Sequence, residues 1–165
     1  MSLEKSLKMK QKIIVTVGIS GSGKSTWATE MCKNHDHVRR VNRDDLRKSL
    51  VGTLEGYYQR EDLWKLEEDV TEIIYLQIDY LLKQGYDLII DNTHLSLKYI
   101  NRIQLTYEKI ANIKIKTFDV DLEQAKRNVL KRDFNCITDD EVITDERVDY
   151  INKQFDSYHK LIKKL

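Results

Sequence analysis

The 165-residue sequence predicts an α/β fold, an open parallel sheet of about four to five strands with helices on both faces. Three observations lead to this fold class. Short β-rich apolar runs alternate with segments whose apolar residues recur every three or four positions. A glycine-rich stretch separates the first run from the first helical segment. The alternation of strand and helix implies right-handed crossovers, which bring strands together in parallel.

The first half of this alternation surrounds the glycine-rich stretch. Residues 12–17 (KIIVTV) form an apolar run typical of a buried strand, and residues 26–34 (TWATEMCKN) are predicted to be helical. Residues 37–41 (HVRRV) supply a short second strand. The predicted order is therefore strand, loop, helix, strand.

The second half repeats the pattern. Apolar residues recur at helical spacing between residues 61 and 84, and Gly85 follows as a helix stop, so a long amphipathic helix is predicted. The next predicted elements are a strand at 86–91, a helix at 97–110, a strand at 113–120 and a helix at 122–132. A last amphipathic helix has its apolar face at Val148, Ile151, Phe155, Tyr158 and Ile162. Either Thr138, in a capping-box sequence, or Thr144 is expected to open it.

Composition indicates one domain at residues 12–165, since no proline, repeat or low-complexity tract marks a linker. Residues 1–11 are interpreted as an N-terminal extension that includes residues from the expression vector. Lys and Arg total 28 against 27 Asp and Glu, and a net charge of +1 argues against tight non-specific binding of duplexes. Two distant cysteines and the lack of a long apolar run favour the cytoplasm, away from membranes.

The strongest chemical signal is the stretch GISGSGKST, which starts at Gly18. It matches G-x-x-x-x-G-K-[ST] after a strand and at the start of a helix, as this motif requires. Its backbone N–H groups and the helix dipole suit an anion, so we expect Lys24 to reach the β- and γ-phosphates of a nucleotide and Ser25 to bind Mg²⁺. Trp27 is interpreted as a helix-packing residue. The predicted nucleotide-binding residues of this stretch are Gly18, Ser20, Gly21, Ser22, Gly23, Lys24, Ser25 and Thr26.

Two adjacent acids, Asp44 and Asp45, follow the second predicted strand. The ligand crevice of an open parallel sheet lies beyond the carboxyl ends of its strands, so both acids should emerge beside the phosphates. Asp44 is suited to accept the proton of an attacking hydroxyl, and Arg47, one turn further, is suited to hold an acceptor anion. Acids are also favoured in the first turn of a helix. We therefore interpret Asp45 as a cap or dipole partner, and the same structural role is the alternative for Asp44.

These motifs, together with three others, resemble a known family. GSGKSTWA, VNRDDLRKSL, LIIDNTHL, FDVDLEQAKRN and YINKQF occur in the order and at the approximate spacing of the kinase module of the bacteriophage polynucleotide 5'-kinase/3'-phosphatase and its relatives in repair enzymes. The resemblance covers most of the chain. It implies a P-loop kinase fold with a small helical lid. It also implies transfer of the γ-phosphate of ATP, with Mg²⁺, to a 5'-hydroxyl of DNA or RNA.

The resemblance further implies roles for single residues. Lys24 and Ser25 would bind phosphates and magnesium, Asp44 would be the general base, and Arg47 would contact the acceptor's own phosphate. The expected partners are single-stranded or terminal 5'-hydroxyl ends of DNA or RNA. A homo-oligomer, and a ligase or phosphatase on a separate chain, are compatible with it.

The end of the third predicted strand, IIDNTHL, departs from the phage pattern. P-loop enzymes commonly place an acid here to help hold magnesium, and Asp91 is the natural candidate. In the phage enzyme the acid corresponds to the position of Asn92, so either residue is open to that role. Thr93 and His94 are candidate acceptor contacts. A histidine directly after a strand is also typical of a local hydrogen-bonding residue.

The family's lid carries an arginine that reaches the transferring phosphates, and the stretch KRNVLKRDF offers several cations. We prefer Arg132, whose guanidinium fork suits phosphate, and then Arg127. Lys131 lies one helical turn after Arg127 and is the third candidate. The alternative is that these cations only form the solvated basic end of a helix and take no part in the reaction.

Two further patterns are given structural interpretations. Asp119 and Asp121 imitate the D-x-D of an aspartyl phosphatase, but Leu122 and Glu123 replace the Gly-Thr that normally follows. An aromatic residue in GYYQR (56–60) is suited to grip a nucleotide, although core or loop positions are preferred for the two tyrosines.

Two other functions remain open. A small-molecule P-loop kinase, acting on a nucleoside, nucleotide or sugar, would use the same loop, base and lid. A nucleotide-dependent binding or ATPase module of a repair complex would need no base aimed at an acceptor hydroxyl. Competition among acceptors distinguishes the first from a polynucleotide kinase, and replacement of Asp44 distinguishes the second.

Overall fold

The computed structural model describes residues 10–134 and 145–165. Its strands form one four-stranded sheet in the order β2-β3-β1-β4, and every neighbouring pair is parallel. The central position of β1 is fixed by Val15, which pairs with Ile90 of β3 and with Ile115 of β4. The predicted open parallel sheet is confirmed. The strands are β1 (Gln11–Val17), β2 (Val38–Val41), β3 (Asp87–Ile90) and β4 (Ala111–Thr117).

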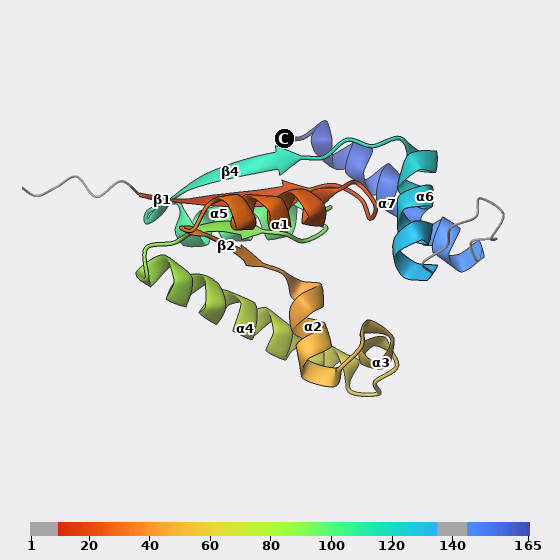
Figure 1. The fold of residues 1–165 in the computed structure, drawn as a ribbon, viewed down its shortest axis with the longest axis horizontal. Coiled ribbons are helices and arrows are strands. Elements are labelled where there is room, and N and C mark those ends of the chain that lie inside the picture. Colours follow the sequence, from red (N-terminus) through yellow and green to blue (C-terminus); the bar gives the residue numbers. More distant parts are fainter. Residues whose placement is uncertain (1–9, 135–144) are drawn as a thin grey trace, which may run out of the picture.

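Helices connect these strands and end the chain (Figure 1). They are α1 (Lys24–Asn34), α2 (Arg43–Val51), α3 (Leu54–Tyr58), α4 (Leu63–Lys83), α5 (Leu97–Tyr107), α6 (Leu122–Phe134) and α7 (Asp145–Ile162). The starts predicted for the last helix, at Thr138 or Thr144, lie outside the described residues.

Local hydrogen bonds account for three differences from the predicted elements. Helix α2 starts where Asn42 Oδ1 accepts from the backbone N–H of Asp45, so Asn42 is the N-cap. Of the two roles predicted for Asp45, the cap is wrong, but the residue lies in the first turn, where a dipole partner is expected. Helix α3 starts at a similar cap, with Thr53 accepting from Gly56 N. Strand β4 ends before the predicted residue 120, since Asp121 Oδ1 accepts two backbone N–H groups that open α6.

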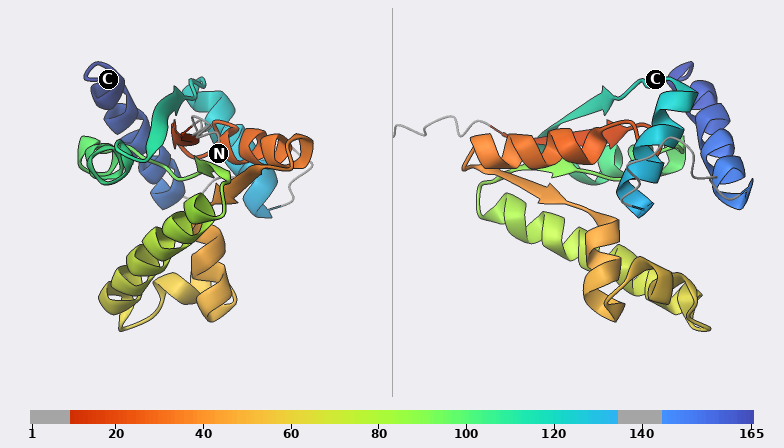
Figure 2. Two further views of the ribbon diagram at one scale, coloured as in Figure 1. Left: turned by 90° about the vertical axis from the view of Figure 1, so that its left-hand side faces the viewer. Right: turned by 45° about the vertical axis from the view of Figure 1, so that its right-hand side comes forward.

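The helices lie on both faces of the sheet, as predicted (Figure 2). Helix α1 covers one face, where Ala28 packs with Val38 and Ile89 of the sheet. The other face is covered by α4 and α5, whose buried side chains share one core with β1, β2 and β3. A separate cluster joins α5, α6 and α7 near the loop that follows β1. This cluster places α6 and α7 beside the carboxyl end of the central strand.

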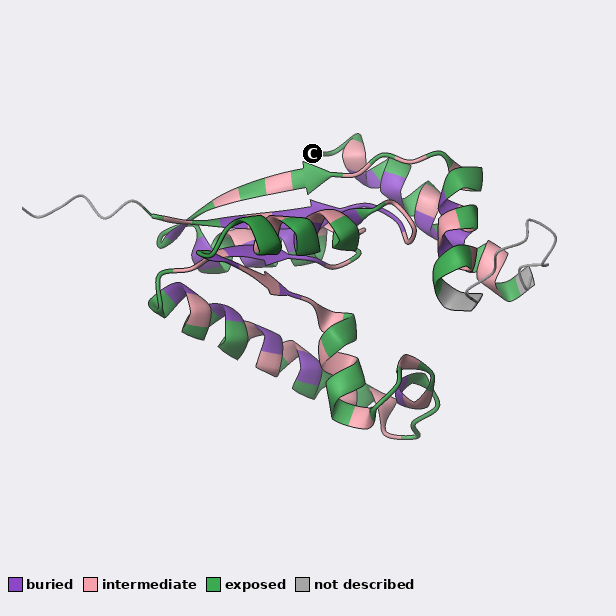
Figure 3. Cartoon of the chain, viewed as in Figure 1, coloured by how far each residue is buried: buried purple, intermediate pink, exposed green. Residues whose placement is uncertain are grey.

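Helix α4 shows how apolar spacing produces this packing. Its buried residues lie four positions apart, so they form one stripe along the helix (Figure 3). The stripe consists of Val70, Ile74, Ile78 and Leu82. The predicted amphipathic helix is confirmed. None of the described helices combines the length and apolar content that crossing a bilayer requires.

Replacement of Ile78 by alanine should destabilise the fold. The side chain is 1% exposed within the main core, so Ile78→Ala should lower the free energy of unfolding by about 2–5 kcal/mol. Leu76 on the same helix is 67% exposed, and Leu76→Ala should change it by no more than about 0.5 kcal/mol. Urea unfolding followed by circular dichroism measures both, and equal losses would contradict the packing described.

Candidate functional site

The glycine-rich loop joins β1 to α1 and returns the chain onto the helix N-terminus. Gly21 and Gly23 have φ angles of +78° and +87°, which other residues rarely adopt. The loop is closed by a hydrogen bond from Ser22 N to Ile19 O at 3.3 Å. Lys24, the first residue of α1, donates from Nζ to the same carbonyl at 2.7 Å. The structure thus places a lysine ammonium directly against the loop at a helix N-terminus, the arrangement that binds phosphates.

Lys24 is buried, and several predicted site residues act on its charge. The pKa of Lys24 is lowered from 10.5 to about 8, mainly by burial and in smaller part by the positive charge of Arg132. The carboxylates of Asp91 and Asp44 act in the opposite direction. The structure therefore brings these four charged residues into one electrostatic neighbourhood, although they come from α1, α6, the end of β3 and α2.

Helices α6 and α7 also contact the phosphate loop. A Cβ at Gly21 would lie 2.4 Å from the carbonyl oxygen of Ala125, so the loop and α6 touch through their backbones. Asn128 Nδ2 donates to Gly21 O at 2.8 Å, and Gln154 Oε1 accepts from Ser20 N at 2.8 Å. The sequence analysis gave Asn128 and Gln154 no role, although FDVDLEQAKRN and YINKQF contain them, because each is more than a hundred residues from its partner.

Asp91 lies at the end of β3 with its side chain buried. Its Oδ2 accepts from Arg40 Nε at 2.7 Å and from Asn42 Nδ2 at 3.2 Å. Asn42 Nδ2 also donates to the backbone carbonyl of Asp91. Oδ1 of Asp91 has no hydrogen-bond partner among the described residues. One carboxylate oxygen thus ties β3 to the start of α2, and the other is a buried acceptor without a hydrogen-bond partner among the described residues.

The residues after Asp91 have different surroundings. Asn92 Oδ1 accepts from Arg43 N at 2.8 Å, which fixes the first turn of α2. Thr93 is exposed, whereas the ring of His94 is buried with Nδ1 2.9 Å from Thr16 O. Burial lowers the pKa of His94, so the ring is neutral at pH 7 and donates from Nδ1. His94 therefore makes a local hydrogen bond, the structural role that was the alternative to an acceptor contact.

Asp44 and Arg47 lie one turn apart on α2 and form an ion pair. Arg47 Nη1 donates to Asp44 Oδ1 at 2.7 Å, while Nε and Nη2 donate to the two carboxylate oxygens of Glu67 on α4, each at 2.9 Å. Burial alone would lower the pKa of Arg47, but the hydrogen bonds to Glu67 and Asp44 and the nearby negative charge together outweigh burial and raise the pKa. Arg47 is thus held by a two-pronged contact, and the half-exposed Asp44 is its second partner.

Glu67 of α4 binds a second arginine of α2, and the sequence analysis did not identify it as a site residue. It also accepts from Arg43 Nη2 at 2.9 Å, so two arginines of α2 converge on one carboxylate of α4. The ring of Tyr57, fully buried, lies 5.7 Å from the Arg47 guanidinium, and the exposed Tyr58 lies 5.8 Å from it. Tyr57 is thus a core residue, while Tyr58 is accessible beside Arg47.

The predicted lid cations all lie on α6 and are exposed. Arg127 Nη2 donates to Gln124 Oε1 at 3.1 Å within the helix. Arg132 acts electrostatically on Lys24, a contribution that is not found for Arg127 or Lys131. Among the three cations, Arg132 is therefore the one whose charge reaches the loop lysine.

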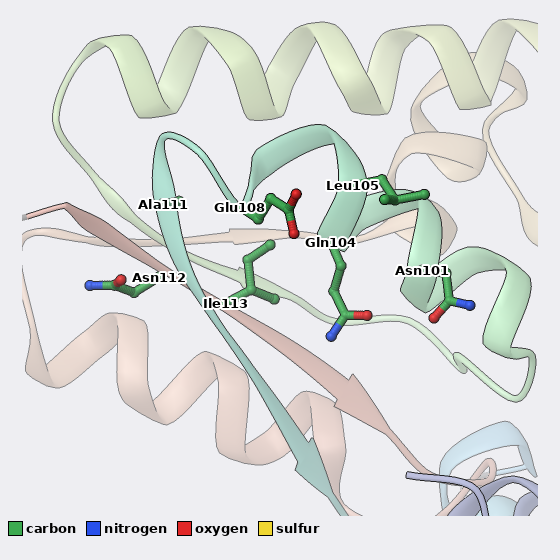
Figure 4. A pocket seen from close by; sticks show the side chains of 7 residues that line it. All are labelled: Asn101, Gln104, Leu105, Glu108, Ala111, Asn112 and Ile113. Carbon is green, nitrogen blue, oxygen red and sulfur yellow. The ribbon is translucent and has the colours of Figure 1, made fainter.

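The other predicted acids have structural partners. Asp45 pairs with Arg40 Nη1. Asp119 accepts from the Tyr158 hydroxyl, and Asp121 caps α6. These contacts agree with the rejection of a phosphatase site. A surface hollow of about 550 Å³ lies between α5 and the start of β4, where Glu108 and Asn112 contribute to its lining, and it contains none of the predicted site residues (Figure 4).

Magnesium fits the residues that are present. The described residues contain no cluster of three or more His, Cys, Asp or Glu side chains able to hold a metal. Mg²⁺ needs no such cluster, since it keeps several waters and commonly binds one or two protein oxygens plus phosphates. The exposed Ser25 in the first turn of α1 and the unpartnered Oδ1 of Asp91 are oxygens of the required kind.

A phosphate loop after the central strand of a parallel sheet defines a P-loop nucleotide-binding protein. The chain belongs to the AAA domain family, whose sequence model matches residues 13–158. This match, with the relatives below, confirms the resemblance to the polynucleotide kinase module.

One relative, from Autographa californica nuclear polyhedrosis virus, is provisionally named a bifunctional polynucleotide kinase/RNA ligase. It is 28% identical over 138 residues, which cover 76% of this chain and 19% of that protein. A chain in the structure of the Pnkp1/Rnl/Hen1 RNA repair complex is 28% identical, with a TM-score of 0.78 over 99% of this chain and 49% of that one. This chain thus spans less than half the length of either relative.

A gluconokinase from Sinorhizobium meliloti 1021 shares the fold alone, with 12% identity and a TM-score of 0.52. The match covers 90% of this chain and 75% of that one. The family match and the two relatives at 28% identity support a kinase-type enzyme.

Replacement of Gly21 by alanine should disturb the loop more than replacement of Gly23. Both positions have positive φ, but only a Cβ at Gly21 would overlap Ala125 O, since nothing lies within 4 Å of one at Gly23. Gly21→Ala should therefore cost about 1–3 kcal/mol more than Gly23→Ala in the free energy of unfolding. Guanidinium unfolding of both variants checks this, and an equal cost would show that α6 can move away from the loop.

Stability should rise with pH through the titration of Lys24. Its folded pKa of about 8 lies below the unfolded value of 10.5, so the unfolded chain holds more protons between these values. Wild type should thus gain up to about 3 kcal/mol relative to Lys24→Met across this window. Urea unfolding of both proteins at about pH 7 and about pH 10 measures the difference. Parallel pH profiles would mean that Lys24 is charged throughout.

Proposed function

We propose that this chain transfers the γ-phosphate of ATP to the 5'-hydroxyl of a DNA or RNA end. The observation that carries the proposal is the Asp44–Arg47 pair, which α2 holds beside the phosphate loop in electrostatic reach of Lys24. A nucleotide-hydrolysing switch has no need of a carboxylate and a guanidinium on the acceptor side. A kinase for a phosphate-containing acceptor needs both.

The loop residues would hold the donor. Backbone N–H groups of residues 18–23, other than those of Ser20 and Ser22 that already have partners, would bind the phosphates with the ammonium of Lys24. Thr26 in the first turn of α1 would add a further contact. Ser25, and Asp91 through water, would hold magnesium, which would neutralise phosphate charge when bound. Phosphate binding favours the charged form of Lys24 and offsets the burial that lowers its pKa.

Asp44 would accept the proton of the 5'-hydroxyl as the oxygen attacks the γ-phosphate. Arg47, positioned by Glu67, would bind the acceptor's own phosphate and so place that hydroxyl in line. Arg132 would approach from α6 and stabilise the charge that spreads over the transferred group. Thr93, exposed at the end of β3, is an additional acceptor contact in this proposal.

The comparisons support a nucleic-acid acceptor. Both relatives with 28% identity carry names that refer to polynucleotide kinase or RNA repair. One of those names joins the kinase to an RNA ligase, which seals ends that a 5'-kinase prepares. We therefore propose that residues 12–165 act as a single kinase domain whose product passes to a ligase.

The test is transfer of labelled γ-phosphate from ATP and Mg²⁺ to DNA and RNA oligonucleotides with a 5'-hydroxyl, beside the same oligonucleotides already phosphorylated and a panel of nucleosides and sugars. Label on the 5'-hydroxyl ends alone supports the proposal. Label on a nucleoside or sugar alone would make the chain a small-molecule kinase. ATP hydrolysis without label on any acceptor would make it a nucleotide-dependent binding module.

Asp44→Asn should reduce transfer by about 10²–10⁴-fold, the usual contribution of a general base, and leave ATP affinity within about twofold. Asp45→Asn is the matched control, since it removes the same charge one residue further along α2. Single-turnover transfer and equilibrium ATP binding separate the two effects. A similar loss of transfer in both variants would mean that the reaction depends on negative charge in the first turn of α2 and not on a general base.

A further inference from the structure

Three side chains form a cluster on the flank of the phosphate loop that faces away from Asp44. The rings of Trp27 on α1 and Phe118 after β4 have centroids 5.5 Å apart and planes at 58°. The ammonium of Lys116, at the end of β4, lies 5.0 Å from the Trp27 ring and 5.1 Å from the Phe118 ring. Two aromatic faces and one cation thus meet at this point, and the proposed transfer reaction uses none of them.

The cluster touches the loop itself. Phe118 N donates to Val17 O at 2.8 Å, so Phe118 continues the pairing of β4 with β1 to the start of the loop. A Cβ at Gly18 would lie 3.0 Å from Phe118 O and 3.1 Å from Phe118 Cβ. Trp27 lies on the first turn of α1, where its backbone N–H donates to Gly23 O at 3.0 Å. The cluster is therefore next to both ends of the phosphate loop.

The sheet order decides which part of the donor reaches this cluster. Strands β3 and β2 lie on one side of β1, and β4 lies on the other. Asp44 and Arg47 follow β2, so a γ-phosphate in line with an acceptor must face the β2 side. The remainder of the donor must then leave the loop toward β4. Phe118 and Lys116 occupy the carboxyl end of that strand.

We propose that Trp27, Phe118 and Lys116 form the site for the nucleobase of the donor nucleotide, a proposal that rests on the proposed function. The base lies against the aromatic faces, since every base offers a π-face for such stacking. Lys116 is exposed and ends a flexible side chain, so its ammonium moves aside and approaches the base edge or the ribose. Stacking of this kind discriminates little between bases.

Trp27 also has a structural role that the test must separate. Part of its side chain packs against the small core that contains Ala28, Val38 and Ile89. A variant at Trp27 is therefore expected to lose some stability whether or not it binds a base. Inorganic tripolyphosphate provides the control, because it carries the phosphates of ATP without nucleobase or ribose.

The experiment measures the affinities of ATP and of tripolyphosphate, each with Mg²⁺, for the wild-type chain, Trp27→Ala and Trp27→Phe by calorimetry. Trp27→Ala should weaken ATP by about tenfold or more, the usual effect of removing a stacking partner, and tripolyphosphate by less than about twofold. Trp27→Phe keeps an aromatic face and should weaken ATP less. Equal loss for both ligands, or no loss for ATP, would overturn the proposal.

Fluorescence gives an independent readout that needs no substitution at the cluster. The chain has two tryptophans, and Trp64 is 68% exposed, so Trp64→Phe leaves Trp27 as the single emitter. ATP should change its emission and tripolyphosphate should not. The same change with both ligands would overturn the nucleobase site and leave the proposed function standing. Failure of the wild type to bind either ligand would overturn both.

Discussion

The position of the proposed acceptor residues depends on how one buried carboxylate is paired. Asp91 is fully buried at the end of β3, and an unpaired charge in that position would cost several kcal/mol, by a rough general estimate. Arg40 and Asn42 satisfy one of its oxygens, and these residues are the end of β2 and the N-cap of α2. The pairing therefore fixes where α2 begins. The position of Asp44 and Arg47 follows from that start.

The donor side depends on the backbone of the loop. Gly21 allows α6 to approach until main chains touch, and Asn128 and Gln154 then hold loop atoms from α6 and α7. Strand β1 lies between the two sides, with its carboxyl end leading into the loop. The sheet thus keeps the phosphate loop and the Asp44–Arg47 pair in a fixed relation.

Sequence patterns predicted the elements and the loop because those features are local. Apolar spacing predicted α4, and the loop motif predicted Lys24 at the start of the first helix, where the structure has it. Contacts between distant residues had no such signal. Glu67 lies on the polar side of a helix whose apolar stripe was predicted, and nothing in that stripe indicates that it binds Arg47. The cap at Asn42 rather than Asp45 was missed since both residue types favour helix starts, and only the contact with Asp91 distinguishes them.

The double pairing of Arg47 has a consequence for selectivity. Glu67 holds two nitrogens of the guanidinium, whereas Asp44 holds one and is half exposed, so an incoming anion can replace Asp44 more easily than Glu67. In the proposed reaction, an acceptor phosphate that took this place would release the carboxylate of Asp44 as the hydroxyl arrives. A sugar without a phosphate offers no exchange partner. The proposed reaction would therefore favour an anionic acceptor, because an anion can displace Asp44 from Arg47 and a neutral sugar cannot.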